Sequence, residues 1–169
     1  MTTHTPTLRV VPFIVDAGVE VIAGHGTFNL LAVEELLKAV ATGAPSAKFG
    51  IAFSEGSDKR LLRRTGNDDD LIQGAAGIVK ELNAGHFFVI LMRDAFPIQV
   101  LNNIKTLATT VNVQVASGNP IRAVVADLGD VSAVIGFSDG GGPTRMETAS
   151  DRQHRRTIVR KIGYLESDL

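Results

Sequence analysis

The sequence contains no cysteine. Without a thiol, the chain can form no disulfide framework, no thiolate zinc site and no cysteine nucleophile. The same absence agrees with a reducing compartment, so we expect a cytoplasmic protein.

Long hydrophobic runs and an excess of charge of one sign are also absent. The longest apolar run, residues 87–92, is far shorter than the ~20 residues of a membrane-spanning helix, and residues 1–5 lack the features of a signal peptide. The 17 lysines and arginines nearly balance the 18 aspartates and glutamates, so the basic field that drives non-specific nucleic-acid binding is missing. We expect no membrane and no nucleic-acid partner, and a small molecule or a protein instead.

The length of the chain fits one compact domain, because domains usually contain ~100 to 200 residues. No internal repeat, low-complexity tract or long linker divides the sequence. We therefore predict a single domain over residues 1–169, in which residues 1–6 form a flexible tail.

The spacing of apolar residues predicts four helices. They cover residues 30–40, 71–82, 97–107 and 150–162. Asn29 is the expected N-cap of the first helix, and Pro97 suits the first turn of the third. We expect the helices to pack on a sheet, with the last one completing the layer.

Strands are predicted from dense β-branched residues and turn signals. Residues 7–15 and 19–23 flank the turn residues Asp16-Ala17-Gly18 and predict an N-terminal hairpin. Further strands are expected at residues 48–53, 87–92, 112–116, 122–126 and 132–137, the last two joined as a hairpin. Since residues 87–92 are apolar throughout, they fit a central strand. The predicted fold is α/β, a single domain with a mixed β-sheet, helices packed on it and hairpins at both ends.

Residues 24–29, Gly-His-Gly-Thr-Phe-Asn, follow a predicted strand and precede a helix, where a backbone can approach a phosphate. The third glycine of a dinucleotide fingerprint is missing, so a tight turn is favoured over a ligand-facing loop. No G-x-x-x-x-G-K-[ST] motif occurs, which excludes a P-loop mechanism.

Residues 64–68, Arg-Thr-Gly-Asn-Asp, precede the second helix, where free N–H groups and the helix dipole can hold a phosphate or a ribose hydroxyl. Capping of that helix by Asn67 or Asp68 explains the same residue types, and the two readings stay open. Asp69 and Asp70 fit solvated partners of the helix dipole.

His86 enters the central strand directly after Gly85, a glycine that leaves room for a ligand or another chain. A histidine can act near neutral pH as a nucleophile, a base or a phosphate carrier, although a lone histidine is more often structural. His4 lies in the expected tail and His154 in a charged helix, where solvated roles are favoured. Asp94, just past the strand, could hold magnesium or activate a hydroxyl, but a position before the next helix explains it more simply.

Two further features allow both a structural and a functional reading. Glycine-rich loops at residues 117–120 and 138–142 permit either simple turns or a nucleotide contact. The last predicted helix has a basic face formed by Arg152, Arg155, Arg156, Arg160 and Lys161. Such a face is most simply solvated, and otherwise contacts phosphate or another subunit.

Five blocks of sequence carry a family resemblance. They are residues 48–52 (Lys-Phe-Gly-Ile-Ala), 64–68 (Arg-Thr-Gly-Asn-Asp), 85–91 (Gly-His-Phe-Phe-Val-Ile-Leu), 95–102 (Ala-Phe-Pro-Ile-Gln-Val-Leu-Asn) and 161–164 (Lys-Ile-Gly-Tyr). In this order the blocks resemble the adenosine-specific kinase family, and the resemblance covers residues 19–164.

The resemblance implies a site for adenosine or AMP, phosphoryl transfer, and a histidine that carries phosphate, a role that falls on His86. The leading hypothesis is a kinase that transfers phosphate from ATP to adenosine, directly or through His86, with Mg²⁺ neutralising the phosphates. The candidates for nucleotide binding are Thr65, Gly66, Asn67, Asp68, Gly85, Phe96 and Asn102. The sequence does not identify metal ligands. The family also implies a homo-oligomer, with a trimer as one form and sites near subunit boundaries.

Two residues depart from the family pattern, and the glycine loop at residues 140–142 is variable. His25 stands where no histidine is expected, and Asp94 stands where an uncharged amide is more usual, which affects the nucleotide preference more than the fold. Two alternatives stay open: a sensor that binds AMP or adenosine with little turnover, and an oligomeric scaffold in which His86 packs at a subunit contact.

Overall fold

The computed structural model describes residues 5–27 and 32–161 of the 169-residue chain. In chain order the elements are β1 (Thr7–Pro12), β2 (Glu20–Gly26), α1 (Ala32–Gly43), β3 (Lys48–Ser54), β4 (Leu62–Gly66), α2 (Asp69–Leu82), β5 (Phe87–Arg93), α3 (Pro97–Lys105), β6 (Thr110–Ser117), β7 (Ile121–Asp127), β8 (Ser132–Asp139) and α4 (Ala149–Lys161). The α/β class expected from the sequence is confirmed. The expected N-cap Asn29 lies outside the described residues.

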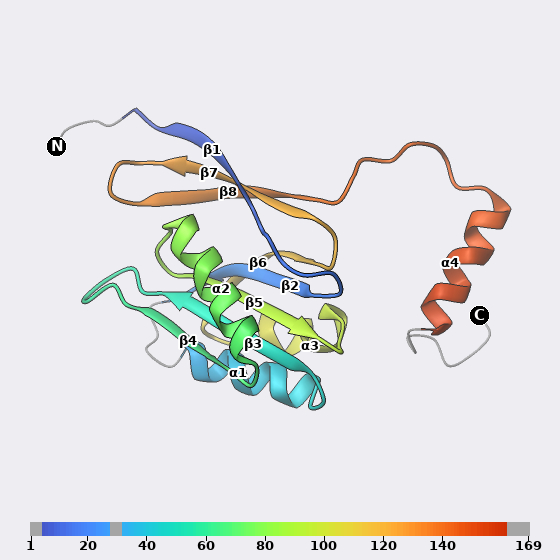
Figure 1. Ribbon diagram of the computed structural model, residues 1–169, viewed down its shortest axis with the longest axis horizontal. Coiled ribbons are helices and arrows are strands. Elements are labelled where there is room, and N and C mark those ends of the chain that lie inside the picture. Colours follow the sequence, from blue (N-terminus) through green and yellow to red (C-terminus); the bar gives the residue numbers. More distant parts are fainter. Residues whose placement is uncertain (1–4, 28–31, 162–169) are drawn as a thin grey trace.

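The strands form two sheets, one of five strands in the order β4-β3-β5-β2-β6 and one of three in the order β1-β7-β8. Helices α1 and α3 pack on one face of the five-stranded sheet through one hydrophobic cluster. Helix α2 and the three-stranded sheet cover its other face through a second cluster (Figure 1). The five-stranded sheet is therefore the central layer of the molecule.

Strand β5 lies in the middle of the central sheet, as its apolar sequence predicts. Phe87, Val89 and Leu91 belong to the cluster on the α2 face, and Phe88 and Ile90 belong to the cluster on the α1 face. Both faces of β5 are covered, which is why its sequence does not alternate between apolar and polar residues.

The predicted N-terminal hairpin does not form. The turn itself is present, with the amide of Val19 donating to the carbonyl oxygen of Asp16 (3.2 Å) and Gly18 at φ +81°. However, β1 pairs with β7, whereas β2 pairs with β5 and β6. The turn thus carries the chain from one sheet to the other, because inward side chains of both strands are buried in the cluster between the sheets.

The expected mixed sheet is likewise replaced by two sheets whose described pairings are all antiparallel. The hairpin of β7 and β8 is confirmed, with Asp127 opposite Ser132 at its turn. Strand β4 is an addition to the prediction, since its sequence Leu-Arg-Arg-Thr-Gly has no buried residue and reads as a polar loop. Edge strands are often short and charged in this way.

Close packing of α2 on the sheet depends on glycine. A Cβ at Gly50 would overlap the backbone of Leu71 and Ile72, so the first turn of α2 can lie directly against β3. The helix begins at the N-cap Asp68, whose side chain accepts a hydrogen bond from the amide of Leu71 (3.1 Å). Capping by Asp68, one of the two readings of its motif, is thus observed.

Helix α4 forms where predicted but does not complete a layer. It has no buried residue, and Figure 1 shows it apart from both sheets, at the end of an extended segment that follows β8. Its sequence offers little apolar surface for packing on the sheet, which explains why the expected placement is wrong. No helix within the described residues is both long and apolar enough to cross a membrane.

Candidate functional site

The ends of three strands meet at His86. The amide of His86 donates to the carbonyl oxygen of Ser54 at the end of β3 (2.8 Å), and its own carbonyl oxygen accepts from the amide of Gly26 at the end of β2 (2.8 Å). The residue has a left-handed backbone at φ +54°, which is uncommon outside glycine, although histidine adopts it more often than most residues do. Backbone bonds to two neighbouring strands hold this conformation.

The imidazole ring of His86 packs against an aromatic ring and a glycine. It stacks on Phe53 with ring centroids 6.2 Å apart and an interplanar angle of 15°. On Gly56, a Cβ would lie only 3.0 Å from the ring atoms of His86, and a Cβ on Gly85 would lie 3.1 Å from the Cα of Gly56. Glycines at positions 56 and 85 therefore allow the loop after β3 to close over the ring.

Ser54 fixes the backbone on both sides of His86. Its hydroxyl donates to the carbonyl oxygen of Ala84 and accepts a hydrogen bond from the amide of Phe87 (3.1 Å). The serine thus ties the turn between α2 and β5 to the end of β3. A side chain in this position holds the histidine at a defined place on the sheet.

His25, at the end of β2, lies beside His86. Its ring and that of Phe87 form a T-shaped pair with centroids 4.9 Å apart, and its amide donates to the side-chain oxygen of Asn112 (3.1 Å). Burial lowers the pKa of His25. A side-chain hydrogen bond with Asn112 raises this pKa, and the charge of His86 lowers it, so that the pKa remains below its ordinary value. His86 thus lies close enough to His25 for its charge to act on the imidazole of His25.

Glu55 places a carboxylate next to the histidine pair. It pairs with Arg63 and accepts a hydrogen bond from the amide of Leu61 (3.0 Å). This backbone bond, then Arg63 and the charge of His86, hold the pKa of Glu55 below its ordinary value. Glu55 thus stays ionised near neutral pH and stiffens the loop that covers His86.

A cleft of about 810 Å³ lies on the other side of Gly56 and Gly85 from His86, which is not itself one of the lining residues. Its walls come from the loop between β3 and β4, the C-terminal half of α2 and the turn between β7 and β8. Gly56 and Gly85, which pack next to His86, belong to its lining, together with the exposed cations Lys59, Arg60 and Lys80. Three cations beside a nucleophilic side chain suit an anionic group such as a phosphate.

The structure brings only some of the sequence candidates together. Gly85 adjoins His86 and the cleft. Gly66 on β4 pairs with Gly50 on β3, and Gly50 in turn pairs with Leu91 on β5. Leu91 is five residues after His86 in the sequence. At ~3.3 Å per residue this separation is roughly 16 Å, so Gly66 and the Thr65, Asn67 and Asp68 that adjoin it lie toward the other end of the sheet.

Several of these distant candidates are engaged in holding the fold. The Asn67 side chain accepts from the amide of Phe49 (2.8 Å) and donates to the carbonyl oxygen of Ala47 (2.9 Å). Phe96 follows the far end of β5, is 41% exposed and caps α3. Asn102 is exposed on α3. In one chain, the candidates thus do not form one site around His86.

Comparison with known proteins gives the family. The model of the adenosine specific kinase family matches residues 11–165. The chain belongs to this family. The crystal structure of the PH1918 protein from Pyrococcus horikoshii OT3 is similar, with a TM-score of 0.89 and 40% sequence identity, covering 96% of this chain and 100% of that one. No curated protein matches the chain.

Membership of the adenosine specific kinase family supports a kinase-type function and implies a nucleotide phosphate donor. Within the described residues, no cluster of three or more histidine, aspartate or glutamate side chains could hold a metal ion. The sequence did not predict the three cations of the cleft. Lys59 and Arg60 lie in the loop between β3 and β4 and Lys80 lies on α2, and no sequence motif links these segments. His25 carried a signal, since it departs from the family pattern.

Proposed function

We propose that this chain phosphorylates adenosine with ATP and that His86 carries the phosphoryl group between them. The observation that supports this most directly is that His86 packs against Gly56, which lines a cleft with the three cations Lys59, Arg60 and Lys80. Family membership supports the reaction class. The proposal places the protein in the cytoplasm, in agreement with its lack of cysteine.

The proposed reaction has two transfers. A neutral imidazole nitrogen of His86 attacks the γ-phosphorus of ATP, an N–P bond forms, and the bond to the bridging oxygen breaks to release ADP. The adenosine hydroxyl then attacks the same phosphorus, the N–P bond breaks, and AMP leaves after the hydroxyl proton passes to solvent or a nearby base. Lys59, Arg60 and Lys80 would balance the phosphate charge, and Mg²⁺ would arrive bound to the phosphates of ATP. Direct transfer from ATP to adenosine is the simpler variant.

The proposed nucleotide contacts divide into two groups. Gly85 lies at the cleft and would allow the ligand to approach the backbone. Thr65, Gly66, Asn67, Asp68, Phe96 and Asn102 remain candidates for the nucleotide. Because Thr65 to Asp68 and Phe96 lie toward the far end of the sheet, they could reach a ligand at His86 only from a second copy. This fits a homo-oligomer, a trimer being one form, with sites at subunit boundaries.

A sensor of AMP or adenosine is the second candidate. The absence of a P-loop motif and the enclosed ring of His86, packed under Gly56, favour a phosphohistidine that persists instead of turning over. A scaffold without ligand is a third possibility, in which the glycine loops only turn the chain.

Calorimetry with adenosine, AMP and guanosine distinguishes these functions when AMP formation from adenosine and ATP is measured in the same samples. The kinase requires adenine-selective binding together with AMP production. Selective binding without product supports the sensor, and binding of no nucleoside leaves the scaffold. Guanosine serves as the control for a purine that lacks the adenine edge.

A further inference from the structure

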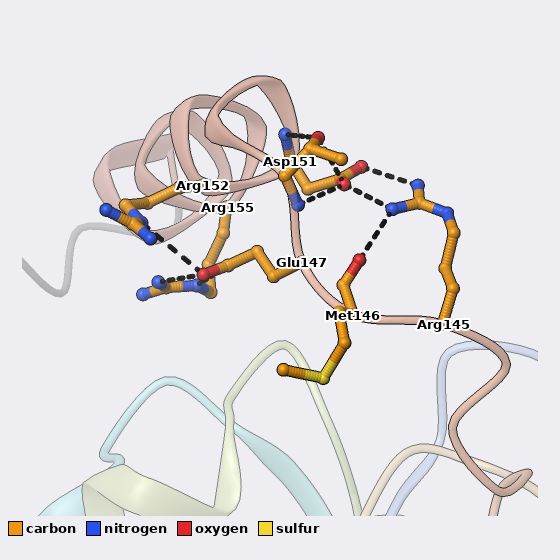
Figure 2. Close-up of polar contacts among 7 residues, drawn as sticks. Arg145, Met146, Glu147, Asp151, Arg152 and Arg155 are labelled. Atoms are coloured by element: carbon orange, nitrogen blue, oxygen red, sulfur yellow. Dashed lines mark hydrogen bonds and ion pairs between the residues drawn. The ribbon is translucent and has the colours of Figure 1, made fainter.

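The segment after β8 forms an ordered unit of its own, residues 140–161, which we call the C-terminal arm. Asp151 pairs with Arg145, and Glu147 pairs with Arg152 and Arg155 (Figure 2). The amide of Thr148 donates to Asp151 (2.8 Å) and the amide of Asp151 donates to the Thr148 hydroxyl (3.3 Å), a reciprocal cap at the start of α4. Local sequence therefore specifies the helix.

Helix α4 nevertheless has no buried residue in its own chain. The helix stands apart from both sheets (Figure 1). Ile158 is 47% exposed and Met146 is 88% exposed. Isolated helices shorter than ~12 to 15 residues are marginal in water, because most helix stability comes from packing. A helix of 13 residues in this position needs a surface to lie on.

The arm belongs to the shared domain of the family. The family match extends through it, to residue 165. The alignment to the Pyrococcus horikoshii protein leaves about seven residues of this chain uncovered, whereas the arm contains 22 residues. Most of the arm therefore has a counterpart in that protein, as expected for a segment with a structural role.

Charge indicates what the arm binds. Helix α4 contains five basic residues and one acidic residue, whereas residues 1–148 contain 12 basic and 15 acidic residues. The rest of the chain is thus opposite in charge to the helix, and opposite potentials favour association and orientation. The rest of the chain also presents uncovered apolar side chains on its three-stranded sheet, where Leu8, Val10 and Ile135 are each more than half exposed. A second copy offers both features.

We infer that the C-terminal arm of one copy packs against the body of a second copy, so that exchanged arms join the subunits. The inference rests on the homo-oligomer of the proposed function and specifies how its copies are held together. It does not depend on the phosphoryl transfer. Extended linkers such as residues 140–148 allow an identical element to be exchanged between copies.

A charge reversal tests the exchange. The double variant Arg156→Glu with Lys161→Glu changes two exposed arm cations that take no part in the ion pairs of Glu147 and Asp151. Lys38→Glu with Lys105→Glu makes the same charge change on α1 and α3. Sedimentation of the full-length proteins should show an oligomer for the unaltered chain, and the arm variant should dissociate about tenfold more readily or worse. The control should assemble normally. A monomeric unaltered chain, or equal assembly of both variants, would overturn the inference.

Cross-linking identifies the contact directly. Because the chain has no cysteine, Ile158→Cys provides one attachment point for a photo-crosslinker on α4. In mixed oligomers of isotope-labelled and unlabelled chains, we expect links from position 158 of one copy to residues 5–139 of another. Links confined to one chain would contradict the exchange, whereas AMP production, measured separately, reports only on the proposed reaction.

Discussion

The amide of Gly26 donates a hydrogen bond to the carbonyl oxygen of His86 (2.8 Å). This bond joins the end of β2, which carries His25, to His86, the residue directly before β5, although about 60 residues separate them in sequence. Together with the bond from His86 to Ser54, it holds the histidine at the meeting point of three strands. The backbone of His86 is therefore tied to the central sheet.

The packing of Gly56 on the His86 ring gives a first prediction. In Gly56→Ala, the new Cβ would lie 3.0 Å from the ring, so the imidazole or the loop must move. We expect phosphoryl transfer to His86 to slow by about tenfold, because small displacements of a nucleophile have effects of this size. Gly77→Ala is the control, since a Cβ there meets nothing within 4 Å. An unchanged transfer rate in the Gly56 variant would show that the ring need not be held as described.

The pH dependence of stability gives a second prediction. Burial, then the charge of His86, lowers the pKa of His25, so the folded protein binds this proton less readily than the unfolded chain does. The contribution of His25 to the free energy of unfolding is then complete above pH ~6.5 and is lost as the pH falls through the lowered pKa. Glu55 is the carboxylate nearby, and its lowered pKa keeps it ionised in this range.

Thermal unfolding at pH 8 and pH 5 measures this effect. The loss of melting temperature between the two values should be smaller in His25→Gln than in the unaltered chain. His154→Gln, which changes an exposed histidine on α4, should retain the full loss. Equal pH dependence in His25→Gln and the unaltered chain would exclude His25 as a source.

The cations of the cleft give a third prediction. In a double variant Lys59→Ala with Lys80→Ala, AMP should bind about tenfold more weakly, since a charge-assisted hydrogen bond contributes ~1.5 to 3 kcal/mol. Adenosine carries no phosphate and should lose much less affinity. Calorimetry with both ligands measures the difference, and Lys38→Ala with Lys105→Ala serves as the control outside the cleft. Parallel losses for AMP and adenosine would place the phosphate elsewhere.

Local patterns in the sequence were sufficient to predict most elements. The apolar run of β5 indicated a strand covered on both faces, and Asp68 with its following helix indicated a cap, because both signals depend on neighbouring residues. The partner of β1 was not predictable in the same way, since β1 pairs with β7 more than 100 residues away. Such pairing is chosen by packing of the whole chain.

The role proposed for His86 stays a prediction that rests on the family resemblance, because the residues alone favoured a structural histidine. The structure adds that Gly85 lines the cleft and that His86 lies next to this lining. Gly56 could not be recognised, because its role depends on a fold that brings the β3–β4 loop over the His86 ring. For α4 the helix was predictable from its sequence, but its separation from the body was not, because apolar spacing does not specify the surface that covers a helix.

The most direct test of the proposed function is the chemical state of His86 after reaction with ATP. The protein is incubated with γ-³²P-labelled ATP, kept at alkaline pH to preserve phosphoramidates, and digested for mass spectrometry, with His86→Ala and His154→Ala treated in parallel. We expect one labelled histidine, at position 86, absent in His86→Ala and retained in His154→Ala, with the label passing to AMP when adenosine is added. Undiminished labelling of His86→Ala would contradict the central role of this histidine.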